Sequence, residues 1–371
     1  MEYDNPKLVI DSEKVLSGAV RWRSPSNIAL VKYWGKYGDQ LPKNPSVSFT
    51  LDAAATDTTM HYRVKKEGGD QVEIELHLDG ERREDFEERT AQFFRRLYPI
   101  YPFLRQLAFR IETSNSFPHS AGIASSASGM SALALCLVSL EEKLFEPLAS
   151  RPDFFHKASY LARLGSGSAC RSVYGDAAVW GRLTDLADSS EEYAVSVANQ
   201  LHAEFQEFHD DILLISRSEK SVSSRAGHGL MDTNPYADIR YGQAKRRCSE
   251  MLRVLNTGDL DRFGEVLESE ALTLHALMMA SSPPYLLIEP NTINAIRAVQ
   301  QWRLDTRNPL YFTLDAGPNL HLLYPAKIAE EVRQFVREDL LNFCAGRQYI
   351  ADRMGSGPQE LEVTNADLAS S

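Results

Sequence analysis

A strict alternation of polar and apolar residues marks one strand in the first quarter of the chain. In Gln71-Val-Glu-Ile-Glu-Leu-His-Leu78 every second side chain is apolar, which is the period of a strand with one exposed face in an antiparallel sheet. The segment 82–98 then changes to the helical period, with its large apolar residues on one side. Shorter apolar runs bounded by turn residues predict further strands at 20–31, 46–51, 107–112 and 177–180.

The second half of the chain predicts mostly helices around a few buried strands. The apolar run 211–216 is typical of a buried strand, and we place the start of a second domain near it. A strand, a turn and a second strand are expected over 311–324, followed by an amphipathic helix that carries Ile328 and Phe343. Helices are predicted at 154–164, 187–207, 234–256, 260–279 and 290–303.

The order of these elements favours an α+β fold. Strands come first and long helices later, without regular βαβ alternation or a glycine fingerprint after the first strand, which argues against a dinucleotide-binding sheet. At 371 residues the chain exceeds the size at which a single core keeps growing. We therefore expect an N-terminal domain over 18–205 and a C-terminal domain over 206–344, with residues 345–371 able to pack back on the first. Residues 1–17 are polar and expected to fray.

Composition and charge indicate a globular protein of the cytoplasm. A hydrophobic fraction of 43% and a charged fraction of 25% are ordinary for a soluble enzyme, and a net charge of −11 argues against nucleic-acid binding. The four cysteines form neither a Cys-x-x-Cys pair nor a zinc spacing, which favours reduced thiols. The acidic N-terminus lacks the pattern of a signal peptide, and the longest apolar run, 130–140, is too short to span a bilayer.

A loop rich in small residues precedes one of the predicted helices. Ser116 to Ser131 holds two glycines and six serines in sixteen residues and runs into an apolar helix expected from about Ala127. Such a loop lets the backbone approach phosphate oxygens, and a helix start directs unpaired N–H groups at the same place. The loop contains no lysine, so it does not match the Walker A pattern. It indicates either polyphosphate binding or a tight helix-packing contact.

Two further loops combine cations with glycine and hydroxyl groups. In Asn27 to Lys36, two lysines flank Tyr33 and a tryptophan, which suits an anionic substrate but also a solvated lysine pair. In Ala162 to Ser172, Arg171 can make a planar two-point contact with a carboxylate or phosphate, although a helix cap with surface arginines has the same composition. Two such loops in one chain favour anion recognition.

A fourth candidate is an aspartate in a turn between two apolar strands. In Asp315-Ala-Gly-Pro-Asn319, partial burial can fix the carboxylate of Asp315, which would let this residue orient or deprotonate a substrate hydroxyl. Aspartate is also an ordinary turn former, so this segment alone favours a structural role. The basic, hydroxyl-rich turn Glu219 to His228 is a weak signal on its own.

Taken in order, these loops resemble the motifs of the diphosphomevalonate decarboxylase family in the GHMP kinase superfamily. The resemblance covers most of residues 20–358. It implies a GHMP kinase-type fold of two α/β subdomains, with the active site in the cleft between them. It also implies ATP-dependent decarboxylation of mevalonate 5-diphosphate to isopentenyl diphosphate through a transient 3-phosphate, with ATP and Mg²⁺, and a homodimer. The strings that carry it are Asn27-Ile-Ala-Leu-Val-Lys-Tyr-Trp-Gly-Lys36, Pro118-His-Ser-Ala-Gly-Ile-Ala-Ser-Ser-Ala-Ser-Gly129, Ala162 to Ser172 and Asp315 to Asn319.

By position, the resemblance assigns roles to individual residues. Asp315 matches the catalytic aspartate near the 3-hydroxyl, Arg171 the arginine that holds the substrate carboxylate, and Lys32 the lysine near the reacting groups. Mg²⁺ would be carried mainly by ATP rather than by a metal site of the protein, with Ser126 as a candidate ligand. The positions that match substrate contacts are Asn27, Tyr33, Lys36, Ser166, Ser168, Ser224 and Arg225. The positions that match the ATP phosphate loop are Gly122, Ala124, Ser125, Ser126 and Ser128.

Two departures from the family pattern leave the substrate open. His228 stands where bacterial members are expected to have methionine, and His119-Ser120 stands where Thr-Ala is usual. A histidine near the 5-phosphate region can alter the preference between a diphosphate and a monophosphate, although both changes also fit drift within loops. The alternatives are a phosphomevalonate decarboxylase, a mevalonate 3-kinase and a ligand-sensing protein without turnover. The sequence also leaves open whether Asp315 is a base or an orienting group.

Overall fold

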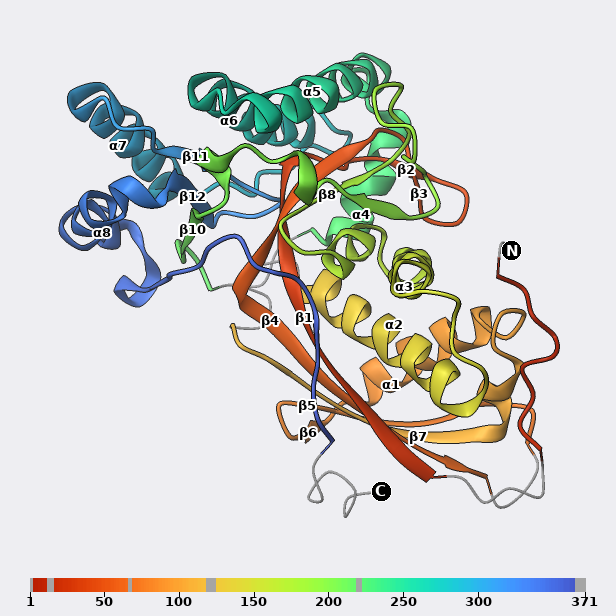
Figure 1. Ribbon diagram of the computed structural model, residues 1–371. Helices are drawn as coiled ribbons and strands as arrows, with labels where there is room; N and C mark the ends of the chain where they lie inside the picture. Colours follow the sequence, from red (N-terminus) through yellow and green to blue (C-terminus); the bar gives the residue numbers. More distant parts are fainter. Residues whose placement is uncertain (1–2, 12–16, 66–68, 118–124, 218–221, 364–371) are drawn as a thin grey trace.

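A large sheet and a smaller one form the frame of the protein (Figure 1). The computed structural model describes residues 3–11, 17–65, 69–117, 125–217 and 222–363, and within these ranges the sheets have eight and four strands. The large sheet has the order β14-β1-β4-β7-β5-β6, with β8 paired to β4 and β9 to β8. Its strands are β1 (Ser17–Val31), β4 (Ser46–Val64), β5 (Glu73–Leu78), β6 (Glu81–Arg82), β7 (Leu107–Asn115), β8 (Ala177–Trp180), β9 (Ala194–Ser196) and β14 (Gln359–Glu360).

The small sheet is antiparallel and lies beside the ends of the long strands. Its order is β11-β12-β10-β13, with strands β10 (Phe208–Leu213), β11 (Tyr311–Thr313), β12 (Leu320–Pro325) and β13 (Tyr349–Ile350). A short hairpin of β2 (Lys36–Tyr37) and β3 (Leu41–Pro42) follows β1. The mixture of sheets and helices matches the α+β class expected from the sequence.

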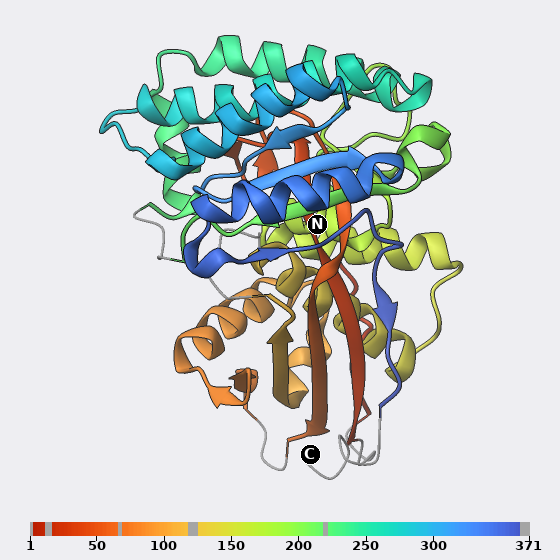
Figure 2. The same cartoon turned by 90° about the vertical axis from the view of Figure 1, so that its left-hand side faces the viewer.

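The helices form two groups (Figure 2). Helices α1 (Glu84–Arg96), α2 (Ser125–Leu144) and α3 (Arg151–Gly165) cover one face of the large sheet. The others lie at the end of the molecule away from α1, in the half that contains the small sheet. They are α4 (Ser224–Leu230), α5 (Ala237–Thr257), α6 (Leu260–Met279), α7 (Pro290–Thr306) and α8 (Ala329–Glu338). Within the described ranges, none of the helices is both long and apolar enough to cross a bilayer.

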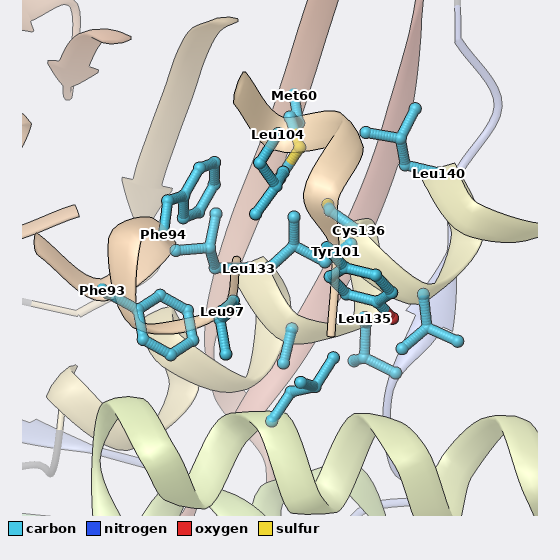
Figure 3. Close-up of a cluster of buried hydrophobic side chains, with 14 of the residues drawn as sticks. Met60, Phe93, Phe94, Leu97, Tyr101, Leu104, Leu133, Leu135, Cys136 and Leu140 are labelled. Atoms are coloured by element: carbon cyan, nitrogen blue, oxygen red, sulfur yellow. The ribbon is translucent and has the colours of Figure 1, made fainter. Parts of the chain in front are cut away.

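The first core fills the space between the large sheet and α1, α2 and α3. Helix α2 is apolar on nearly all sides because it contacts β1 and β4 as well as α3. Figure 3 shows Met60 of β4 together with side chains from α1 and α2, and all the labelled residues are buried. Leu8 and Ile10 also belong to this core, so the expectation that residues 1–17 fray is wrong for these two positions. Apolar burial and the hydrogen bonds of Ile10 with the Gln106 side chain hold them there.

The strands β1 and β4 link the two halves of the molecule. They pair antiparallel from Ser17 opposite Arg63 to Val31 opposite Val47, with irregularities near Pro25 and Ala29. Their far ends enter a second core, in which Phe49 lies 6.1 Å from the ring of Phe263 on α6. The end of β1, at Val31, therefore lies in the second core.

The strand expected at 46–51 is longer in the structure and extends to Val64. A carboxylate that is far away in the sequence but adjacent in space supports the middle of this strand. Asp352 accepts hydrogen bonds from the backbone N–H groups of Asp52, Ala53 and Ala54, at 2.9, 2.7 and 2.8 Å. These three residues form an irregular stretch that the local pattern predicts as the end of a strand. The segment that carries Asp352 continues to β14, which pairs with β1 at Trp22 and Arg23.

Two sequence expectations about secondary structure are wrong. The stretch 187–207 is not helical but contains β9 and two single 3₁₀ turns. Pairing of β9 with β8 and hydrogen bonds of the Ser189 hydroxyl to the carbonyls of Leu183 and Leu186 compete with the helix. The strand β5 is antiparallel only to the short β6, and its long neighbour β7 is parallel, because α1 provides a crossover connection.

Local sequence explains why α6 begins where it does. Gly258 ends α5 with a φ of +79°, a left-handed conformation that glycine adopts without strain. The next residue, Asp259, caps α6 by accepting a hydrogen bond from the N–H of Arg262 at 3.1 Å. The helix predicted at 260–279 is confirmed at both ends.

A buried pair of carboxylates in the small sheet gives the fold a pH dependence. Asp210 lies 2.7 Å from Nδ1 of His321, and the hydroxyl of Tyr324 donates to Asp211 at 2.6 Å. Burial raises the pKa of Asp211 from 3.8 to about 6, and Asp210 adds to the shift. Between pH 3.8 and about 6 the folded protein retains a proton that the unfolded chain releases. The contribution of Asp211 to stability therefore falls as the pH rises through this window.

We expect Asp211→Asn to remove the loss of stability that Asp211 causes as the pH rises. The amide still offers an oxygen to the Tyr324 hydroxyl but does not titrate, so the variant gains stability relative to wild type as the pH rises from about 4 to 6.5. The upper limit of the gain is roughly 3 kcal/mol, the free energy that corresponds to the shift. Urea unfolding of both proteins at several pH values measures it. A difference between them that is constant with pH would contradict the assignment.

Candidate active site

The end of β1 and the turn between β11 and β12 bring together Lys32 and Asp315. The ammonium of Lys32 donates to Oδ1 of Asp315 at 2.9 Å and to the carbonyl of Ala29 at 2.6 Å. The lysine side chain is 2% exposed and the aspartate side chain 28% exposed. Charge-assisted hydrogen bonds of this length are stronger than neutral ones and fix orientation. The pair thus presents an oriented carboxylate that is partly accessible to a ligand.

A buried guanidinium lies in the same region. Arg171 belongs to the 3₁₀ segment Gly167–Val173, which follows α3, and its side chain is held by Asn27 of β1 and by two serines of β4. Its Nε and Nη2 donate to Oδ1 of Asn27 at 3.3 and 3.2 Å, its Nε to Ser48 at 3.0 Å and its Nη1 to Ser46 at 2.5 Å. All three of these partners are neutral, so none of them compensates the charge of Arg171.

The guanidinium of Arg171 interacts electrostatically with Asp315 of the Lys32–Asp315 pair. Burial lowers the pKa of Arg171, while Cys170 and then Asp315 act in the opposite direction. A guanidinium stays protonated in proteins because its ordinary pKa is so high. Asn27 is itself fixed, since its Nδ2 donates to the Ser172 hydroxyl at 2.8 Å. A buried guanidinium that is held in place by neutral partners is chemically suited to bind a carboxylate or phosphate.

The turn after Lys32 is braced by a histidine from another part of the chain. Nδ1 of His228 accepts the backbone N–H of Gly35 at 2.9 Å, and its ring lies 4.3 Å from Tyr33 and 4.5 Å from Trp34. Burial, and then the charge of Lys36, lowers the pKa of His228 to about 3, so the ring is neutral. A neutral ring that accepts at Nδ1 carries its proton on Nε2.

The remaining substrate-contact candidates surround this turn. Ser166 directly follows α3, and the carbonyl of Ser168 accepts a hydrogen bond from Asn27 at 3.3 Å. Between them, a side chain at Gly167 would meet Trp180 at 2.8 Å and the Tyr33 hydroxyl at 3.0 Å, so glycine is needed for this close approach. The structure thus brings the Ser166–Ser168 loop against Tyr33.

Lys36 and Ser224 lie on neighbouring short elements. Lys36 opens β2, and its ammonium donates to Oε1 of Gln40 at 2.9 Å. Ser224 is exposed at the first position of α4, which Ser223 caps by accepting the N–H of Ala226 at 3.2 Å. The side chain of Arg225 lies outside the described part of the structure.

The expected phosphate loop is only partly within the described residues. Gly122, Ala124 and the departure His119 lie outside them. Helix α2 begins at Ser125, two residues before the expected start, and Ser126 is exposed in its first turn. Ser128 is fully buried, and its hydroxyl lies 2.6 Å from that of Thr56. Its side chain therefore supports the helix start against β4. The contact of Ser128 with ATP stays a prediction.

Sequence reasoning missed residues that orient the charged groups. Ser46 and Ser48 hold Arg171, and Glu270 and Arg240 hold Lys32 from helices α6 and α5. The alternating hydroxyls of Ser46-Val-Ser-Phe-Thr50 were a usable signal, since period two places them on one face of a strand. For the helix residues, no local pattern distinguishes them from ordinary surface charges.

Family models match both parts of the chain. The model described as the diphosphomevalonate decarboxylase-like N-terminal domain matches residues 24–191. The model described as the mevalonate 5-diphosphate decarboxylase C-terminal domain matches residues 212–367. Between them the two matches include Lys32, Arg171 and Asp315.

Individual relatives agree with the family models. The diphosphomevalonate decarboxylase of Gibberella zeae is 32% identical over 324 residues, which are 83% of this chain and 81% of the relative. A structure of MDDEF in complex with MVAPP, AMPPCP and magnesium has a TM-score of 0.79 at 29% identity and covers 94% of this chain and 100% of that one. A structure of the mevalonate diphosphate decarboxylase from Enterococcus faecalis has a TM-score of 0.78 at 28% identity. The match covers 94% of this chain and 100% of that one.

The two sheets, with charged groups assembled where they meet, define a protein with the GHMP kinase-type fold. The family models and the identity with curated relatives then define the family within this class. The chain belongs to the diphosphomevalonate decarboxylase family, and the resemblance seen in its loops is confirmed.

Proposed function

We propose that this chain uses ATP and Mg²⁺ to convert mevalonate 5-diphosphate into isopentenyl diphosphate, ADP, phosphate and CO₂, in the mevalonate pathway of isoprenoid biosynthesis. The observation that carries the proposal is the Lys32–Asp315 pair at 2.9 Å beside the buried guanidinium of Arg171. Family membership and the complex of a related enzyme with MVAPP, an ATP analogue and magnesium support the substrates.

The reaction has two stages. The oxygen of the tertiary 3-hydroxyl attacks the γ-phosphorus of ATP, the bond from that phosphorus to the β,γ-bridging oxygen breaks, and ADP leaves. The C3–O bond of the 3-phosphate then breaks, and phosphate departs with its electron pair. The bond between C2 and the carboxyl carbon supplies the electrons of the new C2–C3 double bond, which releases CO₂. Phosphoryl transfer asks the protein mainly for positioning and charge neutralisation.

Each charged group suits one part of this sequence. Asp315 is partly exposed and held by Lys32, so its carboxylate can accept or orient the proton of the 3-hydroxyl. The ammonium of Lys32 can offset negative charge that develops during transfer. Arg171 can hold the substrate carboxylate by two parallel hydrogen bonds until the carbon–carbon bond breaks. The remaining contacts proposed for the substrate are Asn27, Tyr33, Lys36, Ser166, Ser168, Ser224 and Arg225.

The start of α2 suits the phosphates of ATP. Unpaired N–H groups and the positive end of a helix dipole attract anions, and Ser125 and Ser126 lie in its first turn. Mg²⁺ usually keeps several waters and binds through phosphates with one or two protein oxygens. The exposed Ser126 hydroxyl is suitable as one such oxygen.

Identification of the product tests the proposal. The purified protein with ATP, Mg²⁺ and mevalonate 5-diphosphate should yield isopentenyl diphosphate by mass spectrometry. Formation of a stable 3-phosphorylated product would instead identify a kinase that stops after the first stage. Binding without ATP turnover would identify a ligand-sensing protein, a role for which the Lys32–Asp315 pair beside Arg171 has no evident use.

A phosphomevalonate decarboxylase is the second candidate, and His228 is the observation that favours testing it. His228 braces the turn that precedes Lys36, which is one of the proposed substrate contacts. We expect His228→Leu to raise KM for the phosphorylated substrate roughly fivefold, as for the loss of one hydrogen bond of about 1 kcal/mol, and to change kcat less. Because the ring is neutral, the rise should be equal at pH 6 and pH 8.

Steady-state assays with the mono- and the diphosphate at both pH values measure this. A rise that disappears at pH 8 would contradict a neutral brace, and an inverted substrate preference would favour the second candidate.

We also propose a homodimer in the cytoplasm, with domains over 18–205 and 206–344 and residues 345–371 packed against the first. The proposed boundary falls between the two ranges that the family models match, 24–191 and 212–367. All four cysteines are free and buried, which suits a reducing compartment. Light scattering of the purified protein tests the dimer, which rests on family resemblance alone.

A further inference from the structure

We propose that helix α6 sets the geometry of the Lys32–Asp315 pair, because Glu270 holds the backbone of Lys32 and His275 holds the backbone of Asp315. The inference rests on the proposed function, in which that pair takes part in phosphoryl transfer. It assigns Glu270, Arg240 and His275 as positioning residues that do not touch the substrate.

The backbone of Lys32 is held on both of its polar groups. Its N–H donates to Oε2 of Glu270 at 2.9 Å, and its carbonyl accepts Nη2 of Arg240 at 3.1 Å. Asn44 donates to the same carbonyl at 3.0 Å. Lys32 directly follows β1, where the ladder with β4 has ended at Val31. These side chains therefore take over the role that a neighbouring strand plays for the residues before it.

The group that holds Lys32 is itself rigid. Arg240 of α5 forms a two-point contact with Glu270, with Nη1 to Oε1 at 2.7 Å and Nη2 to Oε2 at 2.6 Å. The two side chains are only 1% and 0% exposed. Arg247 adds a third contact, from Nη1 to Oε1 at 2.7 Å. Planar two-point pairs of this kind add geometric specificity to their binding energy.

Stability alone is a weak explanation for such a pair. Removing two charges from water costs several kcal/mol per ion, and apolar replacements of buried pairs are often neutral or stabilising. A buried ion pair is better attested where it fixes an arrangement. Here the carboxylate and the guanidinium each make one further hydrogen bond to the backbone of Lys32, so the fixed arrangement includes the position of its ammonium.

The same helix reaches the other member of the pair. His275 is 3% exposed and its Nε2 lies 3.1 Å from the carbonyl oxygen of Asp315. A carbonyl only accepts hydrogen bonds, so Nε2 donates here. Glu270 and His275 are five residues apart on one helix, which corresponds to a rise of about 7.5 Å. One rigid element thus fixes both backbones, and the 2.9 Å contact between the side chains follows from its geometry.

Catalysis by positioning is sensitive to such a device, because a misplacement of about 1 Å can cost roughly a hundredfold in rate. We therefore expect His275→Leu, which leaves the Glu270–Arg240 pair intact, to lower kcat about tenfold or more. The KM values for ATP and for mevalonate 5-diphosphate should change less than about threefold. His275→Gln retains an N–H at a similar reach and should restore kcat to within about threefold of wild type.

A double-mutant cycle separates positioning from a general structural effect. Asp315→Asn should lower kcat strongly, and His275→Leu should then lower the remaining rate by less than about twofold, because His275 acts on the reaction through the backbone of Asp315. The control Leu272→Ala, at a site on α6 that is 46% exposed, should leave kcat unchanged. Circular dichroism and melting temperatures establish that each variant is folded.

The outcomes distinguish this inference from the proposed function. If Lys32→Met retains the wild-type kcat, the proposed role of the pair fails. If Asp315→Asn is impaired but His275→Leu leaves kcat unchanged, or costs the same factor in the wild-type and the Asp315→Asn backgrounds, the positioning role of α6 is overturned. Should His275→Leu not fold, the cycle is made with Arg240→Lys in the Lys32→Met background, because Arg240 holds the backbone of Lys32. Arg240→Lys keeps the charge but lacks the two-point contact with Glu270, and it should show the same non-additivity.

Discussion

The variant Asp315→Asn is expected to lose turnover almost completely while it still binds ATP. An amide has nearly the shape of the carboxylate but can neither accept the hydroxyl proton nor carry the charge that pairs with Lys32. Well-placed acid–base groups contribute about a hundredfold or more, so kcat should fall by at least that factor. Steady-state kinetics give kcat, and titration with a fluorescent ATP analogue gives the nucleotide affinity, which should change less than about threefold.

A matched control is available on α7. Asp305 is exposed on that helix and accepts a hydrogen bond from Gln301 four residues earlier, so Asp305→Asn should leave turnover unchanged. If Asp315→Asn retains more than roughly a tenth of the wild-type rate, Asp315 has no acid–base role, because such groups are worth more than that.

The second large effect is expected for Arg171→Met. Arg171 is 2% exposed, and its guanidinium is fixed by Asn27, Ser46 and Ser48 in a position that suits the substrate carboxylate. Losing one partner of a buried, hydrogen-bonded charge pair costs about 2–5 kcal/mol, which predicts a fall in kcat/KM for mevalonate 5-diphosphate of roughly thirtyfold to several thousandfold. The KM for ATP should change little, since the α2 start is a separate element.

Two comparisons make this result specific. Ser48→Ala removes one of the acceptors that orient Arg171, at 3.0 Å, and should cost about fivefold, as for one hydrogen bond. Arg182→Met, at an exposed arginine, should have no effect. A kcat/KM for Arg171→Met within about tenfold of wild type would mean that Arg171 does not hold the carboxylate.

Segments with a strong local period were predicted well from the sequence. The strand 177–180 and the helix 260–279 have the expected bounds, and β5 and α1 begin within two residues of expectation. For α6, the apolar spacing agrees with the cap residue Asp259 at the start of the helix. Where local signals agree with one another, tertiary structure has little left to change.

Other elements depend on contacts that local pattern does not contain. The extension of β4 beyond Leu51 depends on Asp352, some 300 residues away, whose carboxylate binds three backbone N–H groups. The stretch 187–207 has an acidic, helix-like composition, but pairing with β8 makes part of it a strand. The parallel pairing of β5 with β7 is likewise a property of the whole sheet.

In the candidate site, too, some residues could be predicted from the sequence and others are seen only in the folded structure. Lys32, Arg171 and Asp315 were identified because each lies in a short, unusual string that resembles a family motif. Ser46 and Ser48, which orient Arg171, show in the sequence only as alternating hydroxyls of a strand. The helix residues that orient Lys32 have no sign in a single sequence. Glu270 is separated by 238 residues from the Lys32 backbone that it binds, so only the folded structure reveals the contact.

The most direct test of the central claim is the amount of CO₂ released for each ADP, with mevalonate, its 5-phosphate and its 5-diphosphate offered separately. The purified protein with ATP and Mg²⁺ should release ADP and CO₂ in equal amounts with the diphosphate, and neither product at a comparable rate with the other two. Release of ADP without CO₂, or turnover of the monophosphate in preference to the diphosphate, would contradict the proposed reaction.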